Sequence, residues 1–390
     1  MRAAERRRQL DAELLAHRDL WHPQPFREAR PAWCERWPAL TAALLALDDA
    51  DVAHLNDDTP AALRWLAAYL PDVDVLLPLI DIPLAARVPP PVPGERWAWE
   101  IPGRKRSQIE AFAGAVQPGG EGVIDWCGGK GHLGRLLGLA WQQPVHTLEI
   151  DAALCGEGEQ LARRIGLNHR FLERDALAVA DWPRQGQHAV ALHACGNLHR
   201  RLLEHGAGAG VSRFDVAPCC YYRGVETHYQ PLVASGSLQL TRDDTRLAVT
   251  ETVTATPRLT RQRDQGIAWK LAFTAWRAQV SDSPYKTFKP VPAPWLRGSF
   301  ADFLARMAAR EGLPPPEARH LASIEATGWQ RQREVLRLSI PRHAFRRALE
   351  LWLVLDLAQY LETCGYAHRL ATFCDRHLTP RNLLLSAWRS

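Results

Sequence analysis

The segment with the clearest chemical potential is rich in glycine and follows an apolar stretch at residues 122–124. It reads Asp125-Trp126-Cys127-Gly128-Gly129-Lys130-Gly131. Glycines between a strand and a helix allow backbone amides to approach a ligand at the start of the helix. That ligand can be a pyrophosphate or the amino-acid part of S-adenosylmethionine (SAM). Because residues 129–134 also match the pattern GxGxxG, an NAD-dependent oxidoreductase is one interpretation.

Asp125 distinguishes the two interpretations. Dinucleotide-binding folds usually run an apolar strand directly into the first glycine, whereas here a carboxylate ends the expected strand. A carboxylate repels a pyrophosphate and attracts the charged amino group of SAM. Cys127 stands where the pattern D/E-x-G-x-G-x-G has its first glycine, which is acceptable if the position needs only a small side chain. We expect SAM, and not NAD, to bind at Asp125, Cys127, Gly129 and Gly131.

Further acidic residues follow the next two expected strands. Glu149 ends the second strand, where a carboxylate can accept hydrogen bonds from ribose hydroxyls. Asp151 is a second candidate for this role, although it also suits the N-cap of the next helix. Asp175 and Ala176 follow the third strand, where an acid–Ala pair can meet the adenine amino group. Acids at three successive strand ends together indicate SAM more strongly than any one of them.

Cysteine and histidine side chains are expected near the same cleft, because ligands of a doubly wound sheet bind at the carboxyl ends of its strands. They are Cys127, His193, Cys195, Cys219 and Cys220. The cysteines can line a tight pocket as small side chains, bind a metal or iron–sulfur group, or supply a catalytic thiolate. They lack close ligand spacings and adjacent cysteines tend to point apart, so we expect no stoichiometric zinc or iron.

Methyl transfer from a sulfonium needs mainly in-line positioning and, for some acceptors, a base. His193 is our candidate for that base, and Cys195 and Asn197 of the same segment are further catalytic candidates. The alternative for His193 is a structural role. Arg381 and Asn382 can face the acceptor or close a turn through hydrogen bonds. The acceptor-side candidates are Cys219, Cys220, Tyr221 and Arg381.

Strands and helices alternate from residue 122 onward, which predicts a parallel sheet covered on both faces. A helix at 342–364 then precedes two short strands, which fits the last two strands of a class I methyltransferase, with the final strand antiparallel. We therefore expect an α/β, Rossmann-like, seven-stranded sheet. Its strands are expected at 122–125, 145–149, 169–172, 189–192, 214–217, 367–373 and 382–388.

The remainder of the chain is divided by composition. Residues 1–99 have helical periodicity and end in a proline-rich run at 88–93. The core is expected at 100–223, an Arg- and Pro-rich insertion at 224–340, and the last helix and strands of the core at 341–390.

Composition limits the class of protein. The chain has 390 residues, of which 46% are hydrophobic and 23% charged, with a net charge of +5. These values are typical of a globular protein and permit an anionic partner such as RNA. Eight cysteines without CxxC pairs fit a reducing cytoplasm, and no segment reads as a membrane span.

Several of these motifs together resemble one methyltransferase domain family. The stretches that carry the resemblance are 104–110, 125–135, 192–198, 218–222, 347–356 and 379–383. Members include eukaryotic methyltransferase-like proteins of the ribosomal-RNA-adenine-dimethylase-domain-containing group and the glutathione S-transferase C-terminal-domain-containing protein. Acceptor-stem tRNA ribose methylases are more distant members.

The resemblance implies a class I fold, SAM as cofactor and methyl transfer. Asn197 stands where several relatives have Asp, and the zinc-binding modules of the tRNA enzymes are absent, so the tRNA activity does not transfer directly. RNA is slightly favoured as acceptor over a protein or a small molecule. The alternative from another class is a non-catalytic SAM- or RNA-binding protein, and an NAD-dependent oxidoreductase is less supported.

Overall fold

The computed structural model describes residues 2–91, 94–234, 236–251, 256–281, 289–314 and 316–389. The end of the proline-rich run at 88–93 and parts of the expected insertion lie outside these residues. The chain folds into two compact units. The first contains residues 1–16, 75–254 and 346–390, and the second contains residues 17–74 and 255–345.

This division differs from the expected one at both ends of the core. Most of the N-terminal helical region belongs with residues 255–345, because the short helix α6 (Thr59–Leu66) packs on α16 (Ile340–Ala344). Residues 224–254 belong to the unit that contains the sheet. Composition indicated an addition to the core but not that two distant segments build it together.

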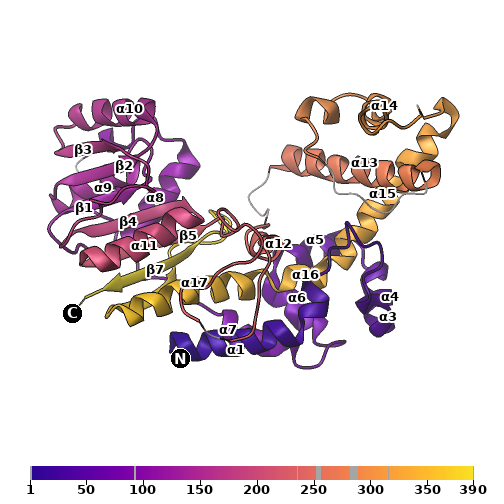
Figure 1. Cartoon of the computed structure of the whole chain (residues 1–390), viewed down its shortest axis with the longest axis horizontal. Coiled ribbons are helices and arrows are strands. Elements are labelled where there is room, and N and C mark those ends of the chain that lie inside the picture. Colours follow the sequence, from indigo (N-terminus) through magenta and orange to yellow (C-terminus); the bar gives the residue numbers. More distant parts are fainter. Residues whose placement is uncertain are drawn as a thin grey trace. The chain divides into compact units, whose positions relative to one another are not determined.

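The first unit is built on one seven-stranded sheet with the order β3-β2-β1-β4-β5-β7-β6 (Figure 1). Strands β1 to β5 pair in parallel, and β7 is antiparallel to both β5 and β6. The expected seven-stranded α/β sheet is therefore confirmed. The strands are β1 Val123–Trp126, β2 Val145–Glu149, β3 His169–Glu173, β4 His188–Cys195, β5 Arg213–Cys219, β6 Ala367–Thr372 and β7 Leu383–Trp388.

Helices pack on the strands of this sheet. Helix α9 packs on β1 and β2, α11 on β4 and β5, and α17 on β6 and β7. The strand β1 is buried along its whole length, as expected for a central strand with layers on both faces. The helices of this unit are α1 Ala3–Ala16, α7 Leu76–Ile80, η2 Arg96–Ala98, α8 Gly103–Ala115, α9 His132–Trp141, α10 Ala152–Arg163, α11 Asn197–Ala209, α12 Arg242–Leu247 and α17 Arg346–Thr363.

The N-terminal helix α1 is fixed to α17 by a buried polar network. Arg7 pairs with Asp356 at 3.2 Å, and both side chains are almost fully buried. Asp356 also accepts hydrogen bonds from the Tyr229 hydroxyl and from two backbone amides. Asp11 accepts a hydrogen bond from the Trp352 indole. Removal of one partner would leave a buried charge uncompensated, so α1 is an integral part of this unit.

Within the described residues, every regular element of the second unit is a helix. Its longest helices, α13 (Pro257–Ser281) and α15 (Leu321–Leu338), pack closely, and a Cβ at Gly328 would lie 2.3 Å from the Ala268 carbonyl oxygen. An aromatic core that includes Trp269 and Phe303 joins them to α14 (Phe300–Glu311). The remaining helices are α2 Arg18–Trp21, α3 Trp33–Arg36, α4 Pro38–Ala46, α5 Asp49–Asp57, η3 Ala293–Leu296 and η4 Ala318–His320, with η1 Val73–Val75 at the boundary between the units.

Candidate cofactor and acceptor site

The glycine-rich loop between β1 and α9 has a left-handed backbone at alternate residues. The φ angles are +56° at Cys127, +60° at Gly129 and +61° at Gly131. A Cβ at Gly131 would lie 2.6 Å from His169, so this glycine is required both by its backbone conformation and by space. The first glycine of the methyltransferase pattern is therefore explained by backbone conformation. Cys127 adopts that conformation despite its side chain, so a small side chain is not the only requirement.

Asp125 lies beneath this loop. The strand continues through Trp126, so Asp125 does not end it as expected, and its side chain is only 2% exposed. Its carboxylate accepts a hydrogen bond from the Gly134 amide at 2.9 Å, which fixes the start of α9. Burial raises the pKa of Asp125 to about 6, although the hydrogen bond opposes this shift. Asp125 thus fixes the start of α9 from the interior of the unit.

Glu149 connects the end of β2 to the same loop. Its Oε2 accepts a hydrogen bond from the Gly129 amide at 3.0 Å. Its Oε1 accepts hydrogen bonds from the Ile150 and Asp151 amides at 2.9 and 3.1 Å. The carboxylate is half-buried at the strand end, as the sequence analysis expected. It therefore organises the backbone of two loops at once.

The other cofactor-binding candidates have local structural roles. Asp151 is the N-cap of α10, where its side chain accepts hydrogen bonds from the Ala153 and Leu154 amides. This is the alternative that the sequence analysis left open for it. Asp175 accepts a hydrogen bond from the Leu177 amide at 2.8 Å in the turn after β3, and Ala176 beside it is buried.

His193 lies in an irregular part of β4. The register with β5 shifts between Leu192 and Cys195, and His193 itself has φ +66°. Burial, followed by the nearby positive charge of Arg381, lowers the pKa of His193 to about 4. The imidazole is therefore neutral at pH 7 and can accept a proton. A strained backbone at a strand end is common at functional sites.

Three of the expected cysteines converge. The Sγ atoms of Cys195, Cys219 and Cys220 all lie within 4.8 Å of one another, and those of Cys195 and Cys219 are 3.5 Å apart. The expectation of no metal rested on the lack of close ligand spacings and on adjacent cysteines pointing apart, and the second ground does not hold for Cys219 and Cys220. Cys220 has φ +47°, which turns its side chain toward that of Cys219 instead of to the opposite face.

Cys127 does not join this cluster, and it is not a thiolate. Burial, followed by the charges of Glu149 and Asp125, raises its pKa to about 12. Cys220 differs, because hydrogen bonds from the other two thiols and the charges of Arg223 and Arg381 lower its pKa. Cys127 therefore lies outside the group formed by Cys195, Cys219 and Cys220.

Two of the acceptor-side and catalytic candidates point elsewhere. The Tyr221 side chain is buried, packs edge-on against His199 and donates from its hydroxyl to the Pro218 carbonyl at 3.4 Å. It therefore belongs to the interior and cannot face an acceptor in this conformation. Asn197 is the first residue of α11, where its exposed side chain lies against Gly224.

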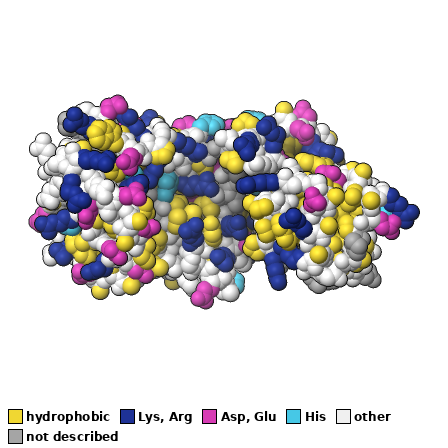
Figure 2. Space-filling model, turned by 90° about the horizontal axis from the view of Figure 1, so that it is seen from above, with side chains coloured by type: hydrophobic (Ala, Val, Ile, Leu, Met, Phe, Trp, Pro, Cys, Tyr) yellow, Lys and Arg dark blue, Asp and Glu magenta, His cyan; other side chains and the backbone are white. Residues whose placement is uncertain are grey.

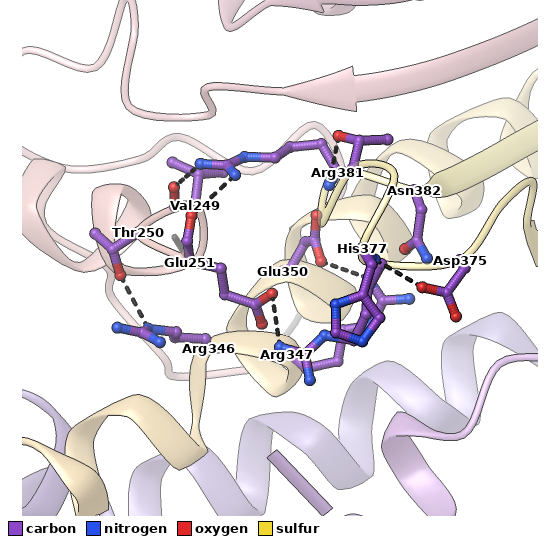
Figure 3. A network of polar contacts seen from close by, with 12 residues as sticks. Val249, Thr250, Glu251, Arg346, Arg347, Glu350, Asp375, His377, Arg381 and Asn382 are labelled. Atoms are coloured by element: carbon purple, nitrogen blue, oxygen red, sulfur yellow. Dashed lines mark hydrogen bonds and ion pairs between the residues drawn. The ribbon is translucent and has the colours of Figure 1, made fainter. Parts of the chain in front are cut away.

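Arg381 lies in a polar network that includes the turn before β7 (Figure 3). Its guanidinium donates to the carbonyls of Val249 and Glu251. Asn382 donates to the Cys374 carbonyl at 2.7 Å and so closes the turn, as one of its two interpretations expected. Arg381 fastens the segment after α12 to this turn and also lies near His193, so its guanidinium is held mainly by backbone and not left free for an acceptor.

Two residues near the site were not singled out from the sequence. Arg223 lies close to Cys195 and Cys220, and its carbonyl accepts a hydrogen bond from the Asn197 amide. Glu251 pairs with Arg376 at 3.1 Å in the network of Figure 3. Arg223 could have been found from its position directly after the Cys-Cys-Tyr-Tyr stretch. The sequence around Glu251 contains no motif that would have indicated a role at the site.

Comparison with known proteins identifies a family for the segment that contains the glycine loop and the three clustered thiols. Residues 104–226 match the family described as "Methyltransferase domain". This segment is a methyltransferase domain. The sheet order of the first unit and its antiparallel β7 are those of class I, SAM-binding methyltransferases.

Part of this chain is similar to part of two insect proteins. The glutathione S-transferase C-terminal domain-containing protein homolog of Drosophila melanogaster is 32% identical over 124 residues, which are 30% of this chain and 20% of that protein. The homolog of Drosophila pseudoobscura pseudoobscura is 30% identical over 125 residues with the same coverage. The match thus spans about a fifth of the length of these curated relatives.

Two methyltransferases of known structure are similar to parts of this chain at low TM-scores. The magnesium protoporphyrin IX methyltransferase of Synechocystis PCC 6803, with bound S-adenosylhomocysteine, has a TM-score of 0.32 at 13% identity, over 76% of this chain and 93% of that one. The tRNA (uracil-54, C5)-methyltransferase of Pyrococcus abyssi has a TM-score of 0.25 at 12% identity, over 30% and 28%. In the described part of this chain, no helix is long and apolar enough to cross a membrane.

Proposed function

We propose that this chain transfers a methyl group from SAM to an acceptor. The observation that carries the proposal is the joint construction of the ends of β1 and β2. There, Glu149 accepts a hydrogen bond from the Gly129 amide of the loop. The buried Asp125 accepts one from the Gly134 amide of α9, and its carboxylate lies so close to position 128 that only a glycine fits there. The Glu149 carboxylate at the end of β2 suits a ribose, and the negative charges of Glu149 and Asp125 beside the loop do not suit the pyrophosphate of NAD.

The residues present fit SAM. A Cβ at Gly129 would meet no atom within 4 Å, so the space beside the left-handed loop is open. A carboxylate offers about four acceptor positions, of which Glu149 uses three for backbone amides. A ribose hydroxyl can take the fourth. When bound, SAM supplies an activated methyl group on a sulfonium.

The chain's own residues then have separate tasks. Glu149 and the loop amides orient the cofactor, which places the methyl group for in-line transfer. His193, in the irregular part of β4, accepts a proton from the acceptor where the acceptor has one to lose. Arg381 and Arg223 supply positive charge near the acceptor side of the strand ends.

RNA is our preferred acceptor, with a protein or a small molecule next. The preference rests on the net charge of +5 and on the predominance of arginine among the basic residues. Figure 2 shows Lys and Arg side chains spread over the visible face among acidic and apolar ones, and not gathered in one patch. The preference therefore rests on overall charge, and the test must include all three acceptor classes.

The direct test compares RNA, proteins and small molecules from a deletion strain and its parent by mass spectrometry. We expect one methyl group to be missing in the deletion strain, and to be restored by purified protein with labelled SAM. The Asp151→Ala variant, which changes a helix cap near the loop, serves as the control and should restore it too. Binding of SAM without any missing or restored methyl group would indicate a non-catalytic SAM-binding protein.

We also propose that the protein works in a reducing compartment such as the cytoplasm. All eight cysteines are free in the structure, including the closely placed Cys195 and Cys219. A secreted protein with two thiols 3.5 Å apart would be expected to oxidise them.

A further inference from the structure

The cluster of Cys195, Cys219 and Cys220 is built by two neighbouring strands. Cys195 ends β4 and Cys219 ends β5, and the two residues are partners in the parallel register. Their Sγ atoms are 3.5 Å apart, and the Sγ of Cys220 completes a set in which all three lie within 4.8 Å. The convergence therefore comes from strand ends, which are well-fixed positions, and not from a flexible loop.

The backbone around the thiols is unusual in a way that produces this convergence. His193 and Cys220 both have positive φ, and β4 changes register between Leu192 and Cys195. Gly196 has φ +56°, and a Cβ there would lie 2.1 Å from the Arg223 carbonyl oxygen. Without these departures, consecutive residues such as Cys219 and Cys220 would point to opposite faces. The strain is thus concentrated where it brings three sulfur atoms together.

The spacing of the sulfur atoms fits a single ion. With metal–sulfur bonds of about 2.3 Å and tetrahedral angles, two thiolates on one zinc ion lie about 3.8 Å apart. That value falls between the 3.5 Å of the closest pair and the 4.8 Å limit of the set. Sulfur atoms bound to different iron atoms of one cluster lie further apart, so the geometry favours a mononuclear ion.

Access and charge also suit a metal with an open position. Cys219 is buried, whereas Cys195 and Cys220 are half-buried, so the cluster is reachable from one side. A divalent cation with three thiolates carries one net negative charge, which the nearby guanidinium groups of Arg223 and Arg381 balance. Three protein ligands with a free fourth position are typical of reactive zinc sites.

We propose that Cys195, Cys219 and Cys220 bind one thiophilic divalent cation, with zinc as the first candidate. The fourth position is left to water or to a group of the bound acceptor. Each thiol loses its proton to the buffer as the ion binds, and no oxidation is involved. This proposal does not depend on the proposed methyl transfer. The competing chemistry for the same atoms is a disulfide between Cys195 and Cys219.

The test uses the full chain, purified anaerobically with a reductant and freed of metal by a chelator. Calorimetric titration of this metal-free chain with Zn²⁺ should show that one equivalent binds. Titration with Co²⁺ should show sulfur-to-metal charge-transfer absorbance. Cys195→Ser, Cys219→Ser and Cys220→Ser should each lower zinc affinity at least tenfold and reduce that absorbance. Cys364→Ser, which changes a cysteine outside the cluster, should do neither.

Several outcomes would overturn the proposal. One is the absence of zinc binding by the wild-type chain, and another is equal binding by the cluster variants and Cys364→Ser. A Cys195–Cys219 disulfide, found by mass spectrometry in protein purified without a reductant and accompanied by no metal affinity after reduction, would assign the pair to redox chemistry. Thermal melting of each variant separates loss of ligands from loss of fold, and SAM binding by the metal-free chain keeps the result distinct from the proposed function.

Discussion

The Glu149 carboxylate accepts a hydrogen bond from the Gly129 amide at 3.0 Å. This single contact ties the end of β2 to the glycine loop that follows β1. It means that the loop is already organised before a ligand binds, and that a cofactor would find its acceptor and its backbone donors in fixed positions. Preorganisation of this kind lowers the entropic cost of binding.

Replacement of Glu149 should therefore weaken SAM binding in two ways. Glu149→Ala removes the charged acceptor of the ribose and releases the loop. We expect a cost of about 1.5–3 kcal/mol, the range for a charge-assisted hydrogen bond, measured by calorimetry. Asp151→Ala removes only the N-cap of α10, so it should lower the free energy of unfolding by about 1 kcal/mol and leave SAM affinity within a few-fold. Normal SAM binding by Glu149→Ala would instead make Asp151 the ribose partner to test.

His193→Ala should separate turnover from cofactor binding. A base on the acceptor side acts in the transition state, so its loss should reduce kcat on the true acceptor and leave SAM affinity within a few-fold. Because the pKa of His193 is about 4, the wild-type rate should not fall between pH 8 and pH 5 through protonation of this group. A wild-type rate in His193→Ala would assign the residue a structural role.

Cys127→Gly tests why the loop carries a cysteine. Position 127 has φ +56°, a conformation that glycine adopts without strain. We expect Cys127→Gly to bind SAM and to turn over at least as well as the wild type, and to unfold at an equal or higher temperature. Cys127→Val should bind SAM more weakly, because a β-branched residue resists this conformation. Loss of turnover in Cys127→Gly, with SAM binding intact, would show that the thiol takes part in catalysis.

Acid should destabilise the fold through buried histidines. Burial lowers the pKa of His132 and His169 to about 3, and that of His193 and His199 to about 4. In the unfolded chain, all four histidines have a pKa of 6.5. The unfolded chain therefore binds more protons below pH 6.5, and the stability that these groups contribute is full above pH 6.5 and is lost as the pH falls toward 3.

Two buried acids oppose this trend without reversing it. Burial raises the pKa of Asp125 and Glu350 to about 6, so below that pH the folded chain binds a proton at each. Between pH 5 and 6, four histidine protons on the unfolded chain outweigh these two on the folded chain. We expect the melting temperature to fall from pH 7 to pH 5 in calorimetric scans at constant ionic strength. A constant or rising melting temperature would contradict the burial of these histidines.

The sheet was predictable because each strand is a short apolar run followed by a turn. Residues 145–149 were expected as β2 and were found there, and Glu149 lies at its end. The position of Glu149 follows from the strand boundary, but its bond to Gly129 does not, since it depends on how the left-handed loop folds back. The strain at Cys127 could likewise not be inferred from its size.

The site depends on contacts that local patterns do not encode. Convergence of Cys219 and Cys220 requires a positive φ at Cys220, and no neighbouring glycine announces it. Tyr221 follows these cysteines in sequence yet lies in the interior, within a turn that the Arg223 amide closes on the Cys220 carbonyl. The grouping of residues 17–74 with 255–345 also depends on tertiary packing alone.

The central claim is that the glycine loop with Glu149 and Asp125 binds SAM. Isothermal titration calorimetry of the purified chain with SAM, S-adenosylhomocysteine and NAD tests it most directly. We expect saturable binding of SAM and S-adenosylhomocysteine at one site per chain, and no binding of NAD. Saturable binding of NAD with no binding of SAM would contradict the account.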